Sequence, residues 1–188
     1  SEQIRASLID LNFNDVRFTI DFQDKNMPDQ TGMDEICFML STNPGMPVRP
    51  LQDVASGGEL SRIMLAIKAV MADQDEIGTL IFDEIDTGIS GRTAQKVSEK
   101  MAVIADGHQV ICITHLAQIA AMADTHMEIE KYVCDGITKT DMRILSEEEQ
   151  IGELARILGG AELTDTVYQS AREMKTLAGR IKEKQKMI

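Results

Sequence analysis

Two short apolar runs constrain the fold of this chain more than any other feature. Residues 79–82 and 109–114 carry no charge, and each run is followed by a polar residue, Asp83 and His115 respectively. Runs of this length and composition are typical of buried parallel strands. Two parallel neighbours also need a crossover connection between them, which is usually a helix. The two runs therefore predict a parallel sheet.

Helical patterns accompany both runs. Before the first run, six apolar residues recur at helical spacing and share one face: Leu60, Ile63, Met64, Ile67, Val70 and Met71. A second helix is expected over 90–105, with Val97, Met101 and Ile104 facing inward. The order helix, strand, helix, strand, helix predicts an α/β fold with a mostly parallel sheet and flanking helices.

The ends of the chain predict additional elements. Residues 16–22 and 36–40 alternate between apolar and polar, which indicates a β-hairpin or two adjacent strands. A connector over 43–50 with three prolines is expected to be neither helix nor strand. A second hairpin is expected over 127–145, turning at Asp135 and Gly136, followed by helices over 148–158 and 164–184. These patterns predict three parts: a β-rich segment (1–50), a central lobe (51–145) and C-terminal helices (146–188).

Composition limits the partners and the compartment. The net charge of −12 over 188 residues repels a phosphate backbone, so any contact with DNA is expected through a larger assembly. Three widely spaced cysteines indicate neither a disulfide framework nor a zinc site. There is no leader and no apolar run near the roughly 18 residues that span a bilayer, so a cytoplasmic protein without membrane contact is expected. Because the chain begins at Ser1 without an initiator Met, we expect it to be a piece of something longer.

The first candidate site opens the helix that follows the connector. Residues 55–62 read ASGGELSR. One interpretation is a capping box, in which the Ser56 side chain accepts from the N–H of Glu59 and the Glu59 side chain reaches back. The other is that Gly57 and Gly58 leave the first-turn N–H groups open to an anion such as a nucleotide phosphate. The two interpretations are compatible.

The second candidate site is acidic. Asp83, Glu84 and Asp86 follow the first apolar run, at the strand end where open α/β sheets bind ligands. An Asp at this place suits Mg²⁺, and a neighbouring Glu suits the activation of an attacking water. The alternative is a plain acidic loop. We favour the functional interpretation, because adjacent carboxylates repel one another unless a cation or hydrogen-bond donors offset the charge.

The third candidate is His115, at the end of the second run. A lone His at a strand end is more often a hydrogen-bonded structural residue than a catalytic one. Its place in the chain order changes this expectation, because a helix start, an acidic strand end and a His strand end follow one another. Together they predict one phosphate site built from three junctions between strands and helices.

These segments resemble the motifs of ABC-type ATPases. ASGGELSR resembles the signature motif, TLIFDE the Walker B motif, IDTGISG the D-loop and ITH the H-loop. Their order and spacing are similar to the SMC-like branch, in which a long coiled coil interrupts the ATPase head. Within that branch, three segments are similar to those of bacterial ATPases of double-strand-break repair: VASGGELSRIMLAIK, FDEIDTGISG and THLAQIAAMAD. Ala117 departs from the Pro common there, at a position with no proposed chemistry.

The resemblance assigns a role to each candidate residue. Ser56, Gly57, Gly58 and Glu59 would serve the γ-phosphate of ATP held by the opposite head of a dimer. Asp83 would support Mg²⁺, Glu84 would be the general base, Asp86 would line the dimer interface, and His115 would sense the γ-phosphate. The implied fold is the C-terminal lobe of a P-loop NTPase-like ABC ATPase head. The implied function is ATP-driven recombinational repair of DNA double-strand breaks, in the cytoplasm and at the nucleoid.

A phosphate-binding loop of the form GxxxxGK[ST] does not occur in the sequence. None of the 13 glycines begins that spacing, and none is followed by Lys. The chain is therefore expected to need an N-terminal P-loop lobe of the same protein and a second head, and to be inactive by itself. Two alternatives stay open: a non-catalytic interaction module of the same fold, and half of another ABC-type machine such as a transporter. The Asp83–Glu84 pair argues against the first, and the β-rich segment before the signature argues against the second.

Overall fold

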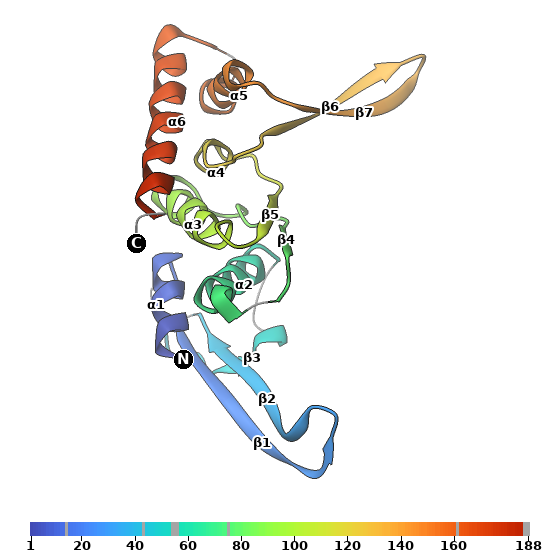
Figure 1. Ribbon diagram of the computed structural model, residues 1–188, viewed down its shortest axis with the longest axis vertical. Helices are drawn as coiled ribbons and strands as arrows, with labels where there is room; N and C mark the ends of the chain where they lie inside the picture. Colours follow the sequence, from blue (N-terminus) through green and yellow to red (C-terminus); the bar gives the residue numbers. More distant parts are fainter. Residues whose placement is uncertain (14, 43, 54–56, 75, 161, 186–188) are drawn as a thin grey trace. The chain divides into compact units, whose positions relative to one another are not determined.

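The computed structural model describes residues 1–13, 15–42, 44–53, 57–74, 76–160 and 162–185. The chain divides into two compact units, Ser1–Ile113 and Thr114–Ile188 (Figure 1). The three-part division expected from the sequence, with boundaries after residues 50 and 145, stays a prediction. In the described residues, no helix is both long enough and apolar enough to cross a membrane.

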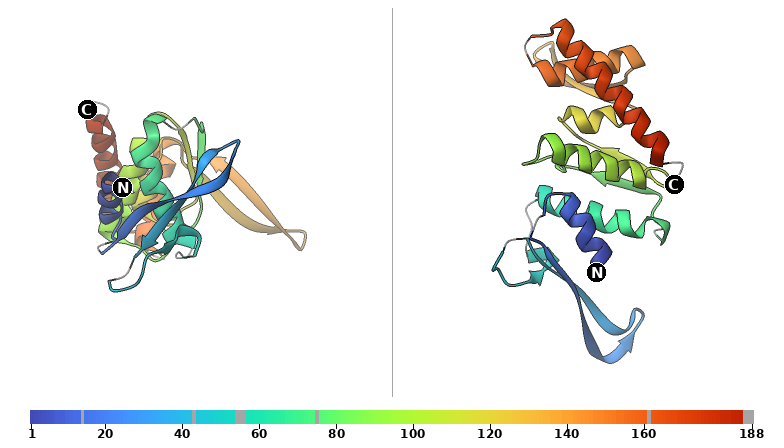
Figure 2. Two further views of the ribbon diagram at one scale, coloured as in Figure 1. Left: turned by 90° about the horizontal axis from the view of Figure 1, so that it is seen from below. Right: turned by 90° about the vertical axis from the view of Figure 1, so that its left-hand side faces the viewer.

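The first unit begins with a helix that the sequence patterns did not predict. Helix α1 (Glu2–Asp10) buries Ile4 and Leu8, which lie one turn apart, and it packs against α2 (Gly57–Met71) (Figure 2). Two apolar positions in a short segment give little helical periodicity, so the contact with α2 stabilises this helix more than its local pattern does. The N-terminal 50 residues are thus strands preceded by a helix.

A long hairpin follows and confirms the first expected strand pair. Strands β1 (Arg17–Asp29) and β2 (Gly32–Ser41) are antiparallel, with Phe18 opposite Leu40 and Phe22 opposite Ile36. Phe18 and Leu40 are buried at the base of the hairpin, whereas Phe22 and Ile36 are exposed farther out. The apolar face of the hairpin therefore continues beyond the core of this unit.

The connector after β2 differs from the expectation. Residues Arg49–Pro50 form a short strand, β3, that pairs with Met39 and Leu40, and a 3-10 turn (Leu51–Asp53) follows. The prediction that 43–50 contains no strand is wrong at these two residues. The three-stranded sheet has the order β1-β2-β3, so β3 is an edge strand, where the missing N–H of a proline breaks no ladder. Asn43 lies outside the described residues.

The predicted α/β core is present in the first unit. After α2 come β4 (Thr79–Phe82), α3 (Gly91–Ile104) and β5 (Gln109–Cys112), and β4 and β5 are parallel and in register from Thr79↔Gln109 to Phe82↔Cys112. The N–H of Ile113 extends the ladder by donating to the carbonyl of Phe82 at 3.1 Å. The crossover helix and the parallel pair confirm the α/β class.

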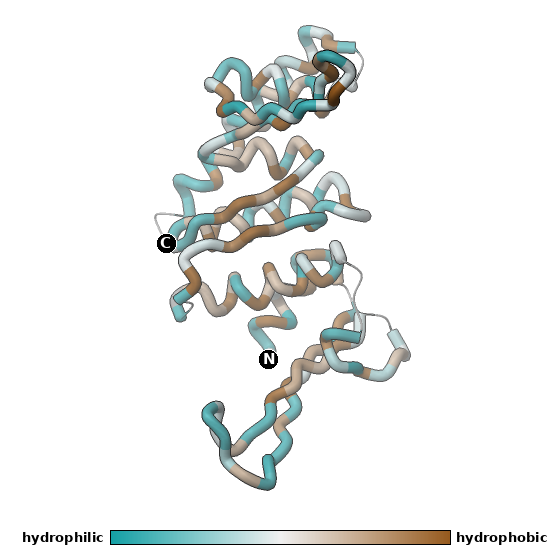
Figure 3. Tube along the Cα trace, turned by 90° about the vertical axis from the view of Figure 1, so that its right-hand side faces the viewer, coloured by the Kyte–Doolittle hydropathy of each residue, from teal (hydrophilic) through white to brown (hydrophobic). Residues whose placement is uncertain are grey.

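The prediction that both strands are buried is wrong. Phe82 is only 5% exposed, but Ile81 is 68% exposed and its register partner Ile111 is 44% exposed. Helices α2 and α3 lie on one side of the two strands, and in the described part of the first unit no element lies on the other side (Figures 1 and 3). The exposed side of β4 and β5, which carries Ile81, Ile111 and Ile113, is called the bare face below.

The described residues of the second unit form a hairpin and three helices. Strands β6 (Met127–Cys134) and β7 (Ile137–Ile144) confirm the expected hairpin, and Asp135 and Gly136 at its tip both have positive φ, as a two-residue type I′ turn requires. The expected terminal helices are α5 (Glu147–Gly159) and α6 (Asp165–Gln185), which pack on each other and on the short α4 (Ala117–Ala121). Helix α5 begins with a capping box formed by Ser146 and Glu149.

Candidate functional site

The acidic residues lie on a tight turn directly after β4. The Asp83 carboxylate accepts from the N–H of Glu84 at 2.9 Å, and the N–H of Thr87 donates to the carbonyl of Glu84 at 3.0 Å. Glu84 has φ = 55°, a left-handed conformation that is strained for a residue with a side chain. Strained turns of this kind cluster at functional sites, so this turn supports the assignment of Glu84 as a site residue.

The start of α2 is bound to this turn by side chains. The Ser61 hydroxyl donates to the carbonyl of Asp83 at 2.9 Å. One guanidinium nitrogen of α2, Nη1 of Arg62, donates to the carbonyl of Ile85 at 3.1 Å and to that of Thr87 at 2.9 Å. The two sequence motifs that were predicted to form one site are therefore in direct contact.

The two glycines of α2 make this contact possible. A Cβ built on Gly58 would lie 2.8 Å from the carbonyl oxygen of Glu84 and 3.0 Å from the Cβ of Thr87. A Cβ built on Gly57 would lie 2.6 Å from Oε2 of Glu84. Gly58 therefore has no room for a side chain while the acidic turn stays where it is, whereas a Cβ at Gly57 would displace only the carboxylate of Glu84. The expected capping box of Ser56 with Glu59 involves a residue outside the described ranges, so it stays a prediction, and Glu59 is half-buried on the first turn of α2.

Burial, together with the charges of Asp86 and Asp83, raises the pKa of the Cys112 thiol, at the end of β5, to about 12. Asp83 directly follows Phe82, whose register partner is Cys112, so it lies at the edge where the two parallel strands end, as expected for a ligand-binding residue of an α/β sheet. Asp86 is only 4% exposed in the first unit. Its role at a dimer interface stays a prediction.

The acidic turn could hold only part of a metal site. Within the described ranges, no group of three or more His, Cys, Asp or Glu side chains could bind a metal ion. Mg²⁺ usually binds through one or two carboxylates, with water and phosphate oxygens completing its shell. The exposed Asp83 fits that pattern, since one carboxylate at a strand end would be the protein's contribution.

His115 belongs to the second unit. It is exposed and lies just before α4, where the N–H of Leu116 donates to the Thr114 hydroxyl at 3.0 Å. Whether it joins Glu84 stays a prediction. Ala117 is the first residue of α4, a helix position that also tolerates proline, so the departure from the family pattern leaves the local fold unchanged.

The sequence patterns missed two features of this site. The first is Arg62, which is only 7% exposed and has its guanidinium 5.8 Å from the centre of the Phe13 ring. Burial lowers the pKa of Arg62, while the charge of Glu59 raises it. Arg62 is the one charged residue among the buried residues of α2, and the sequence patterns gave no sign of its burial.

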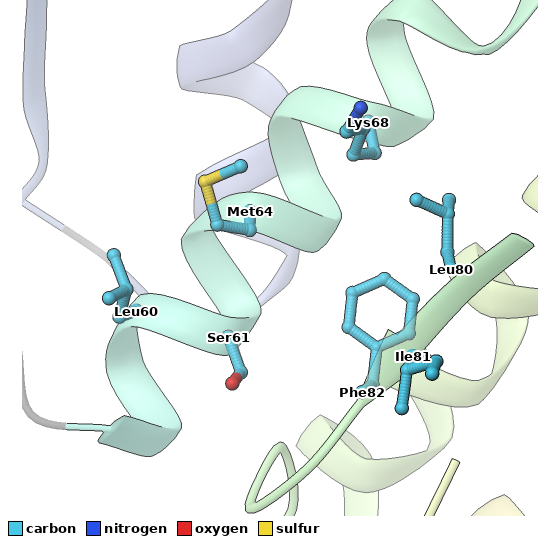
Figure 4. A pocket seen from close by; sticks show the side chains of 7 residues that line it. All are labelled: Leu60, Ser61, Met64, Lys68, Leu80, Ile81 and Phe82. Carbon is cyan, nitrogen blue, oxygen red and sulfur yellow. The ribbon is translucent and has the colours of Figure 1, made fainter. Parts of the chain in front are cut away.

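The second missed feature is a shallow apolar groove of about 320 Å³ between α2 and β4. Figure 4 shows its side chains, four from α2 and three from β4. The groove is lined by Leu60, Ser61, Met64, Lys68, Leu80, Ile81 and Phe82. Because Ile81 belongs to both, the groove is continuous with the bare face.

Comparisons with known proteins agree on one family, although no family model matches the chain. The chain is 46% identical over 181 residues to DNA repair protein RecN of Halalkalibacterium halodurans. This alignment covers 96% of this chain and 32% of that protein. It is 48% identical over 153 residues to DNA repair protein RecN of Bacillus subtilis, with 81% of this chain and 27% of that protein covered. DNA repair protein RecN of Treponema pallidum is 47% identical over 143 residues, with 76% of this chain and 25% of that protein covered.

Two solved structures also resemble the chain. One, described as structural biochemistry of ATP-driven dimerization and DNA stimulated activation of SMC ATPases, has 21% identity and a TM-score of 0.47, with 84% of this chain and 90% of that chain covered. The other is an SmcHead bound to the C-winged helix domain of ScpA, with 24% identity and a TM-score of 0.46, covering 79% of this chain and 44% of that chain. Both TM-scores lie below 0.5.

The start of α2, which resembles the signature motif of ABC-type ATPases, contacts the acidic end of β4, which resembles the Walker B motif. With 46% and 48% identity to RecN proteins, the chain belongs to the RecN family. It spans about a third of the length of the curated relatives that it matches.

Proposed function

We propose that this chain supplies the catalytic groups of a RecN-type ATPase head that hydrolyses ATP during recombinational repair of DNA double-strand breaks. The observation that carries this proposal is the contact of Gly57, Gly58 and Arg62 with the turn that holds Glu84. A plain acidic loop would need neither a strained Glu nor two glycines packed against it.

The residues of the acidic turn divide the chemistry between them. Glu84 would orient the attacking water and accept its proton, and Asp83 would bind Mg²⁺ through its carboxylate. Mg²⁺ bound with ATP offsets the charge of the phosphates. His115 would contact the γ-phosphate from the second unit, and Asp86 would contribute to the face between two heads.

The nucleotide itself would be held by another part of the protein. This sequence has no GxxxxGK[ST] loop, so the β- and γ-phosphates of the ATP next to Glu84 would lie on the N-terminal P-loop lobe. The bare face and the continuous groove offer an apolar surface for that lobe, since parallel strands are normally covered on both sides. Pairing of the two lobes would complete one head.

The start of α2 would serve a second head. Gly57 is exposed at a helix N-terminus, where backbone N–H groups and the helix dipole favour an anion. In an ATP-sandwiched homodimer, Ser56, Gly57, Gly58 and Glu59 would meet the γ-phosphate bound by the opposite head. With a net charge of −12, this segment is a poor DNA-binding surface, so DNA contact would come from the full assembly at the nucleoid.

The test is hydrolysis by the complete protein with Glu84→Gln. This variant should bind MgATP like the wild type but hydrolyse it more slowly, on the order of 10²–10⁴-fold, the usual contribution of a general base. Glu76→Gln, at an exposed residue shortly before β4, is the matched control and should keep the wild-type rate. A wild-type turnover rate in Glu84→Gln would remove Glu84 from this role.

A further inference from the structure

Arg62 is a buried cation that contacts main-chain oxygens. Its Nη1 lies 3.1 Å from the carbonyl oxygen of Ile85 and 2.9 Å from that of Thr87, and its guanidinium lies over Phe13. Burying a charge is costly unless hydrogen bonds offset the lost hydration. An apolar side chain would suit this place on α2 better if packing were its only purpose. The contacts to the acidic turn therefore account for the cation.

These contacts flank the residues of the proposed chemistry. Ile85 follows Glu84 directly, and Asp86 lies between the two carbonyls that Arg62 binds. The neighbouring Ser61 binds the carbonyl of Asp83, on the other side of Glu84. Two adjacent residues of α2 thus hold three carbonyls of one five-residue turn, residues 83–87.

The backbone of Glu84 needs such support. Its φ of 55° is an unfavourable conformation, of the kind that persists only where the surroundings over-determine it. Glycine would relieve this strain but has no carboxylate. The hydrogen bonds from Ser61 and Arg62 fix the backbone on both sides of the strained residue, which in turn fixes the direction of its side chain.

We propose that Arg62 is a positioning residue that holds the turn 83–87 so that the Glu84 carboxylate faces the reacting water. This inference rests on the proposed function of Glu84. Because the same helix begins at Gly57 and Gly58, Arg62 also joins the surface proposed for the γ-phosphate of a second head to the general base of its own head. Its loss should slow the chemical step and leave nucleotide binding intact.

The test uses the complete protein with Arg62→Lys, which keeps the charge but replaces the planar guanidinium by a point-like ammonium with different reach. The single-turnover rate constant at saturating MgATP should fall about 10- to 100-fold, the cost of a small misplacement of a catalytic group. MgATP affinity, measured on the Glu84→Gln background with and without Arg62→Lys, should not change. A rate constant does not depend on the amount of folded protein, so destabilisation alone would not lower it.

Two variants complete the design. Ser61→Ala, at a half-buried helix position, removes one hydrogen bond to the turn and should lower the rate constant by about fivefold, even if Arg62→Lys does not fold. Arg172→Lys, at an exposed position on α6, is the matched control and should keep the wild-type rate. Wild-type rate constants in both Arg62→Lys and Ser61→Ala, or a parallel loss of MgATP affinity, would overturn the positioning role. Failure of the proposed function looks different: Glu84→Gln would then hydrolyse ATP at the wild-type rate.

Discussion

The carboxylate of Glu84 lies against Gly57 at the start of α2, so closely that a Cβ on Gly57 would be 2.6 Å from Oε2. A helix N-terminus favours negative charge. The structure therefore places the proposed general base of this head beside the helix start that is proposed to receive a phosphate from another head. The two proposed sites share one boundary, and Gly57 and Gly58 form it.

Because their neighbours differ, the two glycines should respond differently to substitution by alanine. Gly58→Ala brings a Cβ into the carbonyl of Glu84 and into Thr87, so it should lower the free energy of unfolding by about 1–3 kcal/mol. Gly57→Ala meets only the end of the flexible Glu84 side chain and should stay within about 1 kcal/mol of the wild type. Urea unfolding of both variants checks this order. Equal destabilisation would show that the turn does not press on Gly58.

Burial and the nearby charges of Asp86 and Asp83 predict that the Cys112 thiol reacts slowly with alkylating reagents. Because its pKa is raised to about 12, little thiolate is present at pH 8, and iodoacetamide should modify Cys112 far more slowly than a small free thiol. Asp83→Asn removes one of the charges that raise this pKa and should speed the reaction severalfold, as followed by peptide mass spectrometry. Asp106→Asn, on the exposed loop after α3, is the control. An equal labelling rate in all three proteins would place Asp83 away from Cys112.

His126 predicts a pH dependence of stability in the second unit. Burial lowers its pKa below 6.5, and Lys175 lowers it further, while Glu153 and Glu128 oppose this shift. Below pH 6.5 the unfolded chain therefore binds a proton that the folded chain does not, so the free energy of unfolding should decrease as the pH falls from 7 to 5. His126→Gln should give a flatter profile in thermal unfolding across this range. An unchanged slope would assign the pH dependence to other groups.

Ile81 and Phe82 are neighbours on β4 that point to opposite faces. Phe82→Ala should cost about 3–5 kcal/mol of stability, because the side chain is buried and lies toward α2 (Figure 4). Ile81→Ala should change the stability of this chain by only about 0.5 kcal/mol, because its side chain lies on the bare face. Urea unfolding compares the two.

The position of Ile81 on the bare face leads to a second prediction, about pairing with the P-loop lobe. If the P-loop lobe covers it, Ile81→Lys should weaken co-purification of that lobe with this chain while leaving the chain folded. Retained co-purification would move the contact to another surface.

Local patterns were sufficient for most of the secondary structure. Alternation predicted both hairpins, helical spacing predicted α2 and α3, and the apolar run at residues 79–82 predicted β4. Helix α1 was missed because its buried residues include only two large apolar side chains, Ile4 and Leu8, too few to give a period. The bare face was missed for a different reason. Apolar parallel strands predict cover on both faces, and the described residues of the first unit cover only one.

The residues of the proposed site could be named from the sequence, but their contacts could not. Gly57, Gly58, Asp83 and Glu84 could be named because their types and order match a known motif set. Arg62 could not, because its partners Ile85 and Thr87 are main-chain carbonyls more than 20 residues away, and only the packing of α2 on the acidic turn brings them together. Ser56 lies outside the described residues and His115 lies in the second unit, so their places in the site stay predictions.

We propose that this chain carries catalytic groups for ATP hydrolysis but relies on another lobe to hold the nucleotide. Calorimetry can test this by titrating MgATP first into this chain alone and then into the chain paired with the P-loop lobe. We expect no measurable binding in the first titration and micromolar binding in the second. Micromolar affinity of the chain alone would show that it holds the nucleotide without the other lobe.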